Sequence, residues 1–152
     1  MPTEWTEPTL YSGLKWQSDL HVHSNHISNR LLVSSGVSLE DALSMDQLLD
    51  AWSRSLPSYF HLDHQASCDE PAVQFARCRL WWRFWNLRII LFRQLLLTQA
   101  VERHKNGTVT AFTETDMRSR STAINAASAT IVSIHGYSQS SIITKLVAWY
   151  SM

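Results

Sequence analysis

A long run without glycine or proline, rich in aromatic residues and arginine, most constrains how this chain can fold. It extends over residues 77–97. Proline is well accommodated in the first turn of a helix, so Pro71, which follows two acidic residues suited to a cap and a first turn, is a suitable start. The uninterrupted pattern predicts one long central helix over about residues 71–100, around which the rest of the chain must pack.

The central helix is expected to have one polar and one apolar side. At 100° per residue, four polar residues share a sector of roughly 80°; they are Arg79, Arg83, Asn86 and Arg93. We interpret this polar stripe as a solvated helix face rather than a nucleic-acid contact. Arg88 projects from the opposite, apolar side, where an unpaired guanidinium would be costly. The sequence therefore predicts a buried acidic partner for Arg88.

Two helices are expected before the central run. Apolar residues predict that the first runs from Thr9 or Ser12 to about Leu32, although the pattern is imperfect. A serine and glycine breaker follows, and Ser38 then has the position of an N-cap, with acids in the first turn after it. The second helix carries an amphipathic pattern as far as Trp52 and is ended by Pro57.

Further helices are expected after the central run. Apolar residues at helical spacing predict one over about residues 115–135, closed by Gly136, and a last one that starts near Ser140. The single strand candidate is the short segment 108–112. The expected fold is therefore all-α, a helical bundle or array around the central helix.

The central run also carries a family resemblance. Residues 76–93, which include Trp82-Arg83-Phe84-Trp85-Asn86-Leu87, resemble the signature helix of the fungal-specific transcription factor domain. This domain is the middle homology region of fungal regulators that carry a binuclear zinc cluster. The resemblance continues in residues 9–14, 27–32, 51–60 and 148–150. One departure is Gln94, where the family typically has a proline that would end or kink the helix, so here the helix is expected to continue.

The resemblance implies a regulatory region of a nuclear protein whose zinc cluster reads DNA elsewhere in the full chain. Residues 9–152 would be part of this domain, truncated at both ends, after a flexible end over residues 1–8. Cys68 and Cys78 are the only cysteines, too few for the cluster, so zinc is expected only in the missing DNA-binding module and no cofactor in this chain. Cys78 is interpreted as a small core residue.

The resemblance implies that the partners are other proteins or the rest of the same transcription factor. A small-molecule effector is a further expected partner, which would bind one packing of the helices better than another. Lys and Arg together number 13, as do Asp and Glu, so no net basic field favours direct DNA contact. Arginines interrupt the one strongly apolar run, so no membrane span is expected. The candidate structural or regulatory residues are Arg79, Arg83, Asn86, Arg88, Arg93, Trp82 and Trp85.

The main alternative is a metal-dependent phosphoesterase. The segment Asp19-Leu-His21-Val-His23-Ser24 is similar to the first metal-binding motif of the polymerase-and-histidinol-phosphatase family, in which two histidines at a strand end hold a metal that activates water. No apolar strand precedes it, and the second motif is weakly matched by residues 61–64. We therefore favour the regulatory interpretation. His21 and His23 would be metal ligands only if the chain were a phosphoesterase.

Two further interpretations concern histidines and tryptophans. The i, i+3 pairs His23/His26 and His61/His64 would bind zinc on a helix face only with further ligands, and surface histidines are the commoner explanation. No nucleophile elbow or phosphate-binding glycine loop occurs, so no catalytic residue is predicted. A second alternative is a non-functional truncated fragment that aggregates through its exposed indoles, which are Trp81, Trp82 and Trp85.

Overall fold

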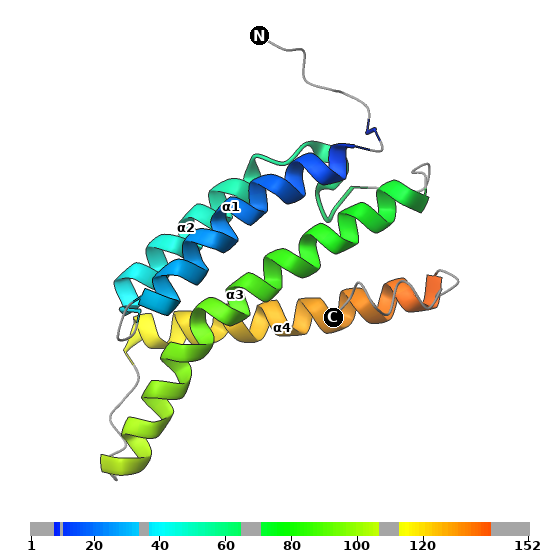
Figure 1. Cartoon of the computed structure of the whole chain (residues 1–152). Helices are drawn as coiled ribbons and strands as arrows, with labels where there is room; N and C mark the ends of the chain where they lie inside the picture. The colour runs from blue at the N-terminus through cyan, green and yellow to red at the C-terminus, as the bar shows by residue number, and fades with distance from the viewer. Residues whose placement is uncertain (1–7, 10, 34–36, 65–70, 107–112, 141–152) are drawn as a thin grey trace.

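The structure, a computed structural model, describes residues 8–9, 11–33, 37–64, 71–106 and 113–140. These residues form four α-helices and no strand: α1 Ser12–Val33, α2 Leu39–Arg54, α3 Pro71–Asn106 and α4 Glu114–Ser140. A short 3-10 helix, η1 Ser58–Phe60, lies between α2 and α3. The predicted all-α fold is confirmed (Figure 1).

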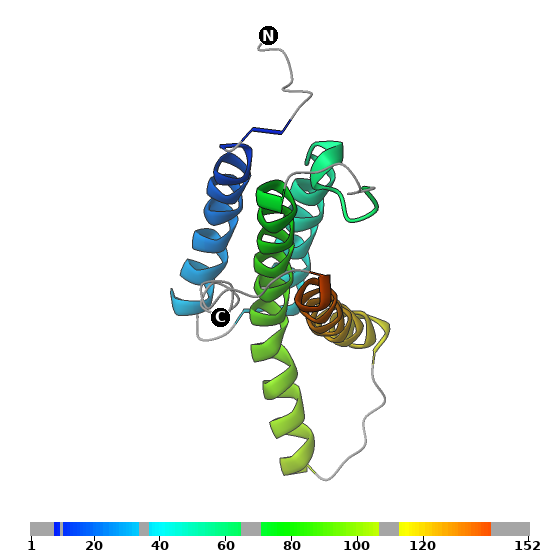
Figure 2. The ribbon, with the colours of Figure 1, turned by 90° about the vertical axis from the view of Figure 1, so that its right-hand side faces the viewer.

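Helix α3 is the predicted central element, and it packs against α1, α2 and α4. Helices α1 and α2 run side by side along its first half, while α4 crosses it, as Figures 1 and 2 show. The helix continues through Gln94, as expected, because this chain lacks the proline that the resembled family typically has at this position. It ends at Asn106 rather than near residue 100. Its last turns extend beyond the other described helices in Figure 1, and Leu97 and Val101 there are exposed.

The first two helices begin and end close to their predicted limits. At the start of α2, the Asp41 amide donates to the Ser38 hydroxyl oxygen over 3.0 Å, so the predicted N-cap is confirmed. This bond satisfies one of the amides that have no partner within the first turn of a helix. The 3-10 helix η1 follows Pro57 and was not predicted.

The predicted end of the fourth helix at Gly136 is wrong. Helix α4 continues through this glycine to Ser140. A glycine in a helix costs about 1 kcal/mol relative to alanine, which neighbouring residues can outweigh, so it does not by itself end a helix. Four other expectations fall outside the described residues: the acidic cap before Pro71, the strand candidate, the last helix and the flexible N-terminal end.

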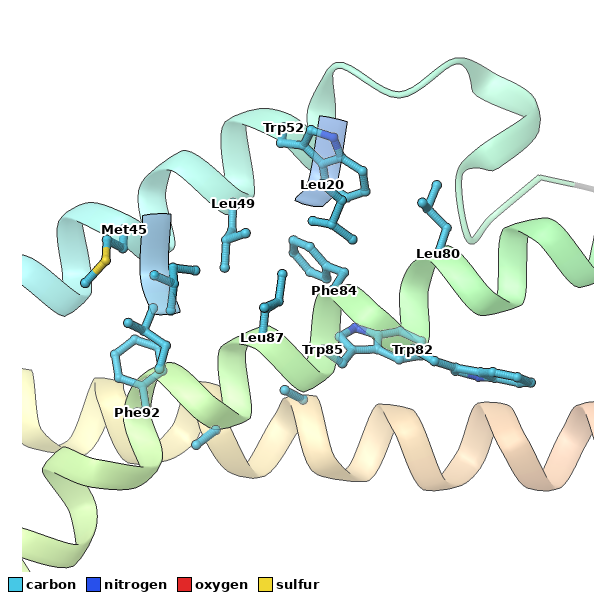
Figure 3. Close-up of a cluster of buried hydrophobic side chains, with 14 of the residues drawn as sticks. Leu20, Met45, Leu49, Trp52, Leu80, Trp82, Phe84, Trp85, Leu87 and Phe92 are labelled. Carbon is cyan, nitrogen blue, oxygen red and sulfur yellow. The ribbon is translucent and has the colours of Figure 1, made fainter. Parts of the chain in front are cut away.

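A single apolar core joins the helices through α3. In Figure 3, Leu49 of α2 points toward Leu87 of α3, and Phe84 lies between α3 and Trp52. The rings of Trp52 and Phe84 are stacked, with centroids 5.8 Å apart. Burying a side chain of this size contributes about 1.5–3 kcal/mol, so each of these contacts stabilises the packing of α2 on α3.

The three indoles of the central run are covered in the folded chain. Trp82 and Trp85 are buried, and Trp81 is half-buried. The Trp81 Nε1–H donates to the Phe60 carbonyl oxygen over 2.7 Å, and the Trp82 Nε1–H donates to the Ser133 hydroxyl over 3.0 Å. Both polar groups are therefore satisfied. The aggregation proposed for a truncated fragment would require these indoles to leave their present contacts.

Candidate functional site

A cavity of about 340 Å³ lies between α1, α3 and α4. This volume is at the lower end of the range of small-molecule sites. Helix α3 contributes most of the wall, α1 the facing wall and α4 one residue. The lining residues are Gln17, Leu20, His21, Ser24, Arg79, Trp82, Arg83, Asn86, Leu87, Ile89 and Thr130.

Two polar stripes with the same spacing face each other across this cavity. On α3, Arg79, Arg83 and Asn86 follow the i, i+4, i+7 spacing that places side chains on one face of a helix. On α1, the residues with this spacing are Gln17, His21 and Ser24. The α3 stripe was predicted from the sequence; the matching α1 stripe was not, although its spacing was a usable signal.

Each of the two arginines of the cavity donates a hydrogen bond to a neutral group of α1. The Arg79 Nη2–H donates to the Gln17 Oε1 over 3.4 Å. The Arg83 Nη1–H donates to the His21 Nε2 over 3.0 Å. Because a guanidinium has no acceptor, this imidazole nitrogen must accept. Of the stripe predicted to be a solvated helix face, Asn86 and Arg93 are exposed, whereas Arg79 and Arg83 are half-buried against α1.

The cavity has a positive electrostatic character. Its lining includes two guanidinium groups one helical turn apart and no carboxylate among the described residues. Partial burial lowers the pKa of Arg83, and the nearby positive charge of Arg79 lowers it further. Both causes oppose the charged form, which indicates that the positive charge at Arg83 is incompletely compensated.

Arg88 lies on the other side of α3 and has the acidic partners that the sequence predicted. Its Nε–H donates to the Asp46 Oδ1 over 2.7 Å, and its Nη2 also pairs with the Asp50 Oδ1. The guanidinium lies 4.8 Å from the centre of the Phe84 ring. Both acids come from α2, so this group, which we call the Arg88 latch, joins α2 to α3. The sequence predicted the partner but not that there are two.

Burial changes the acid–base behaviour of the Arg88 latch. Removal from water raises the pKa of Asp46, the positive charge of Arg88 opposes this rise, and the negative charge of Asp50 adds to it. The net direction is upward because desolvation is the largest effect. The latch therefore depends on Arg88 to hold together two acids that are one turn apart on α2.

A second set of contacts holds η1 on α3. The side chain of Arg77 is buried, and its Nη1–H donates to the Tyr59 carbonyl oxygen over 2.8 Å. The next backbone carbonyl, that of Phe60, accepts the bond from Trp81. These contacts connect the first turns of α3 to the segment after α2. This role of Arg77 was not predicted, because the sequence around Arg77 contains no pattern that identifies a backbone carbonyl 18 positions away as its partner.

The histidines do not have the geometry of the phosphoesterase alternative. His21 and His23 lie within α1, not at a strand end, and residues two apart on a helix project in nearly opposite directions. His61 and His64 follow η1 rather than lying on a helix, and the His61 Nε2–H donates to the Leu56 carbonyl oxygen over 2.8 Å. Among the residues that the structure describes, no group of three or more His, Cys, Asp and Glu side chains could hold a metal.

Cys78 is half-buried against the core, in agreement with its interpretation as a core residue. Burial raises the pKa of its thiol, which disfavours the nucleophilic thiolate.

In the described part of the chain, no helix combines the length and the apolar character needed to cross a membrane.

Comparison with known proteins yields no similarity: no family model, curated protein or solved structure matches this chain.

Proposed function

We propose that this chain is a regulatory module of a fungal zinc-cluster transcription factor, acting in the nucleus through contacts with proteins or with the rest of the same factor. The proposal derives from the family resemblance of the central run. In this role the module carries no catalytic group and does not contact DNA. It controls activity through the packing of its helices around α3.

The observation that supports the proposal is the convergence of the resembling segments on α3. Residues 51–60 and 76–93 are separate in sequence but bind each other directly. Tyr59 and Phe60 of the first segment accept hydrogen bonds from Arg77 and Trp81 of the second. Residues 27–32 lie on α1, which packs against both α2 and α3. Three of the resembling segments therefore belong to one packing unit, while residues 148–150 lie outside the described residues.

The interfaces of α3 suggest how such a module would switch. Both interfaces include core packing. The α2 interface adds the Arg88 latch, whereas the α1 interface adds hydrogen bonds from α3 to the neutral groups of Gln17 and His21. A two-state module needs an interface that can repack at moderate cost. We propose that α1 shifts against α3 while α2 and α3 remain together.

A reporter assay tests this function. Residues 1–152 would be placed between a heterologous DNA-binding domain and an activation domain, with a reporter gene as the readout. We expect the inserted module to lower transcription, and Arg83→Gln to restore it, because this substitution removes the hydrogen bond from Arg83 to His21 that holds α1 against α3. Arg93→Gln, on an exposed position of the same helix, is the matched control and should behave like wild type.

Protein levels measured by immunoblotting would separate release from degradation. Equal reporter output with and without the module, at equal protein levels, would contradict the proposed function. The same conclusion would follow if Arg83→Gln and Arg93→Gln had identical effects.

A further inference from the structure

We propose that the cavity between α1, α3 and α4 binds a small amphiphilic organic anion. Arg79 and Arg83 would hold its carboxylate or phosphate group, and the apolar wall would hold its hydrocarbon body. The biological role of this ligand as an effector rests on the proposed regulatory function, but its binding does not.

The charge distribution of the cavity is the first argument. Arg79 and Arg83 are one turn apart on α3, and like charges at this spacing repel each other. Within the described part of the chain, Arg83 forms no ion pair, and its hydrogen bond goes to the uncharged acceptor of His21. An anion placed between the two guanidinium groups would replace repulsion with two charge-assisted interactions.

The polar and apolar parts of the lining are the second argument. Asn86 and Ser24 add an amide and a hydroxyl to the polar side of the cavity. The apolar side is formed by Leu20, Leu87 and Ile89 together with the indole of Trp82. A few polar groups among apolar side chains are typical of a site that orients a small molecule. The ligand should therefore combine one charged head group with a short aliphatic or aromatic body.

The partial burial of the positive charge argues against an extended polyanion. Both arginines are half-buried and line one half-open pocket between three helices rather than a continuous basic surface. The whole chain has no net charge, with 13 basic and 13 acidic residues. Nucleic-acid binding draws on many exposed basic groups that contact successive phosphates. A single small anion matches this local arrangement better.

Titration of the purified 152-residue chain with three probes of equal chain length tests the proposal. Hexanoate and hexyl phosphate carry the two candidate head groups, and hexanamide is the uncharged control. Isothermal titration calorimetry should show saturable binding of at least one anion, with hexanamide weaker by about tenfold or more. Tighter binding of hexanoate would assign the head group as a carboxylate, and tighter binding of hexyl phosphate as a phosphate. Equal affinity for hexanamide, or no saturable anion binding up to about 10 mM, would overturn the proposal.

Variants at matched positions of α3 test the assignment of the site. Arg83→Gln removes the charge at nearly constant volume and should weaken anion binding by about tenfold or more, whereas Arg93→Gln, outside the cavity lining, should bind like wild type. Unchanged affinity in Arg83→Gln would overturn the assignment. Circular dichroism would show whether each variant is folded. Should Arg83→Gln be unfolded, Ser24→Leu provides the second test, because it fills the cavity and should abolish binding without changing the charge.

The two proposals fail in different ways. Loss of reporter control with anion binding intact would refute the regulatory function alone. Absence of anion binding with reporter control intact would refute the effector site alone.

Discussion

Two arginines five positions apart on α3 have opposite surroundings. Arg88 reaches across the interface to α2 and pairs with Asp46 and Asp50, and only 18% of its side chain is exposed. Arg83 faces α1 across the cavity and binds the uncharged Nε2 of His21. One guanidinium is compensated by two carboxylates, while the other has a neutral acceptor and a second guanidinium nearby. The same residue type on one helix therefore serves two purposes.

This difference separates residues that hold the fold from residues available to a ligand. A buried ion pair is difficult to lose, because removal of one member leaves an uncompensated charge away from water. A partly buried cation without a counter-ion adds little to stability and can be favoured by a bound anion. We therefore expect substitutions on the α2 side of α3 to affect folding, and those on the cavity side to affect binding.

The largest expected effect is the loss of the Arg88 latch. Arg88→Gln should lower the free energy of unfolding at pH 7 by about 2–4 kcal/mol, because Asp46 is then buried without its counter-ion. Arg83→Gln, the same substitution on the cavity side, should change it by no more than about 0.5 kcal/mol, since it also removes a like-charge repulsion. Urea denaturation of both variants would measure the difference, and equal losses would contradict the comparison.

The latch should also show a characteristic pH dependence. An acid whose pKa is raised in the folded protein is more easily protonated there than in the unfolded chain. Its contribution is therefore most favourable at low pH and is lost as pH rises through the raised pKa. Without Arg88, the pKa of Asp46 should rise further. The loss in free energy of unfolding that Arg88→Gln causes should accordingly be smaller at about pH 4 than at pH 7.

A smaller effect is expected at Gly13, where α1 approaches α3 closely. A Cβ atom added at Gly13 would lie 2.9 Å from the Ala76 Cβ, which cannot rotate away. Gly13→Ala should therefore force the helices apart and lower the free energy of unfolding by about 1–3 kcal/mol. The control is Gly136→Ala in α4, where no atom lies within 4 Å of the added Cβ and stability should rise by up to about 1 kcal/mol. Thermal denaturation of the pair would test the closeness of α1, and a stabilising Gly13→Ala would contradict it.

The smallest effect is expected at the start of α4, where an acid behaves oppositely to Asp46. The Asp116 Oδ2 accepts from the Thr113 hydroxyl over 2.7 Å and from its amide over 3.1 Å, and the Gln99 amide donates to the Oδ1. Chiefly because of the hydroxyl bond, the pKa of Asp116 is lowered. Its contribution should be present above about pH 4 and lost as pH falls through the lowered pKa.

Asp116→Ala tests this opposite sign. It should lower the free energy of unfolding by about 1 kcal/mol or less at neutral pH, and the deficit should shrink below about pH 3, where the wild-type carboxyl is also protonated. Denaturation at several pH values would measure this trend, with Asp19→Ala on an exposed position of α1 as control. If the loss in free energy of unfolding were independent of pH, the charge of the Asp116 carboxylate could not be its cause.

Local patterns predicted most of the helical elements because their causes lie within a few residues. Ser38 caps α2 through an amide three positions away, and the run after Pro71 contains no residue that interrupts a helix. Where a local cause was weak, the prediction failed: Gly136 disfavours a helix slightly, and the neighbouring residues of α4 outweigh it.

The candidate site was predictable only in part. Helical periodicity placed Arg79, Arg83 and Asn86 on one face, but it did not indicate which neighbour would cover that face. The matching stripe on α1 lies about 60 positions earlier, and its relation to α3 depends on how the helices pack. A spacing rule within one helix contains no information about the facing helix.

The sequence by itself determined that this chain is helical, where its central helix begins, and that Arg88 must have an acidic partner. Each of these follows from local hydrogen bonding, periodicity or the cost of an unpaired buried charge. The tertiary structure alone decided that the partners are Asp46 and Asp50, that Arg77 holds η1, and that Arg83 faces a cavity. These depend on the relative placement of helices distant in sequence, which is set by how their apolar surfaces fit together.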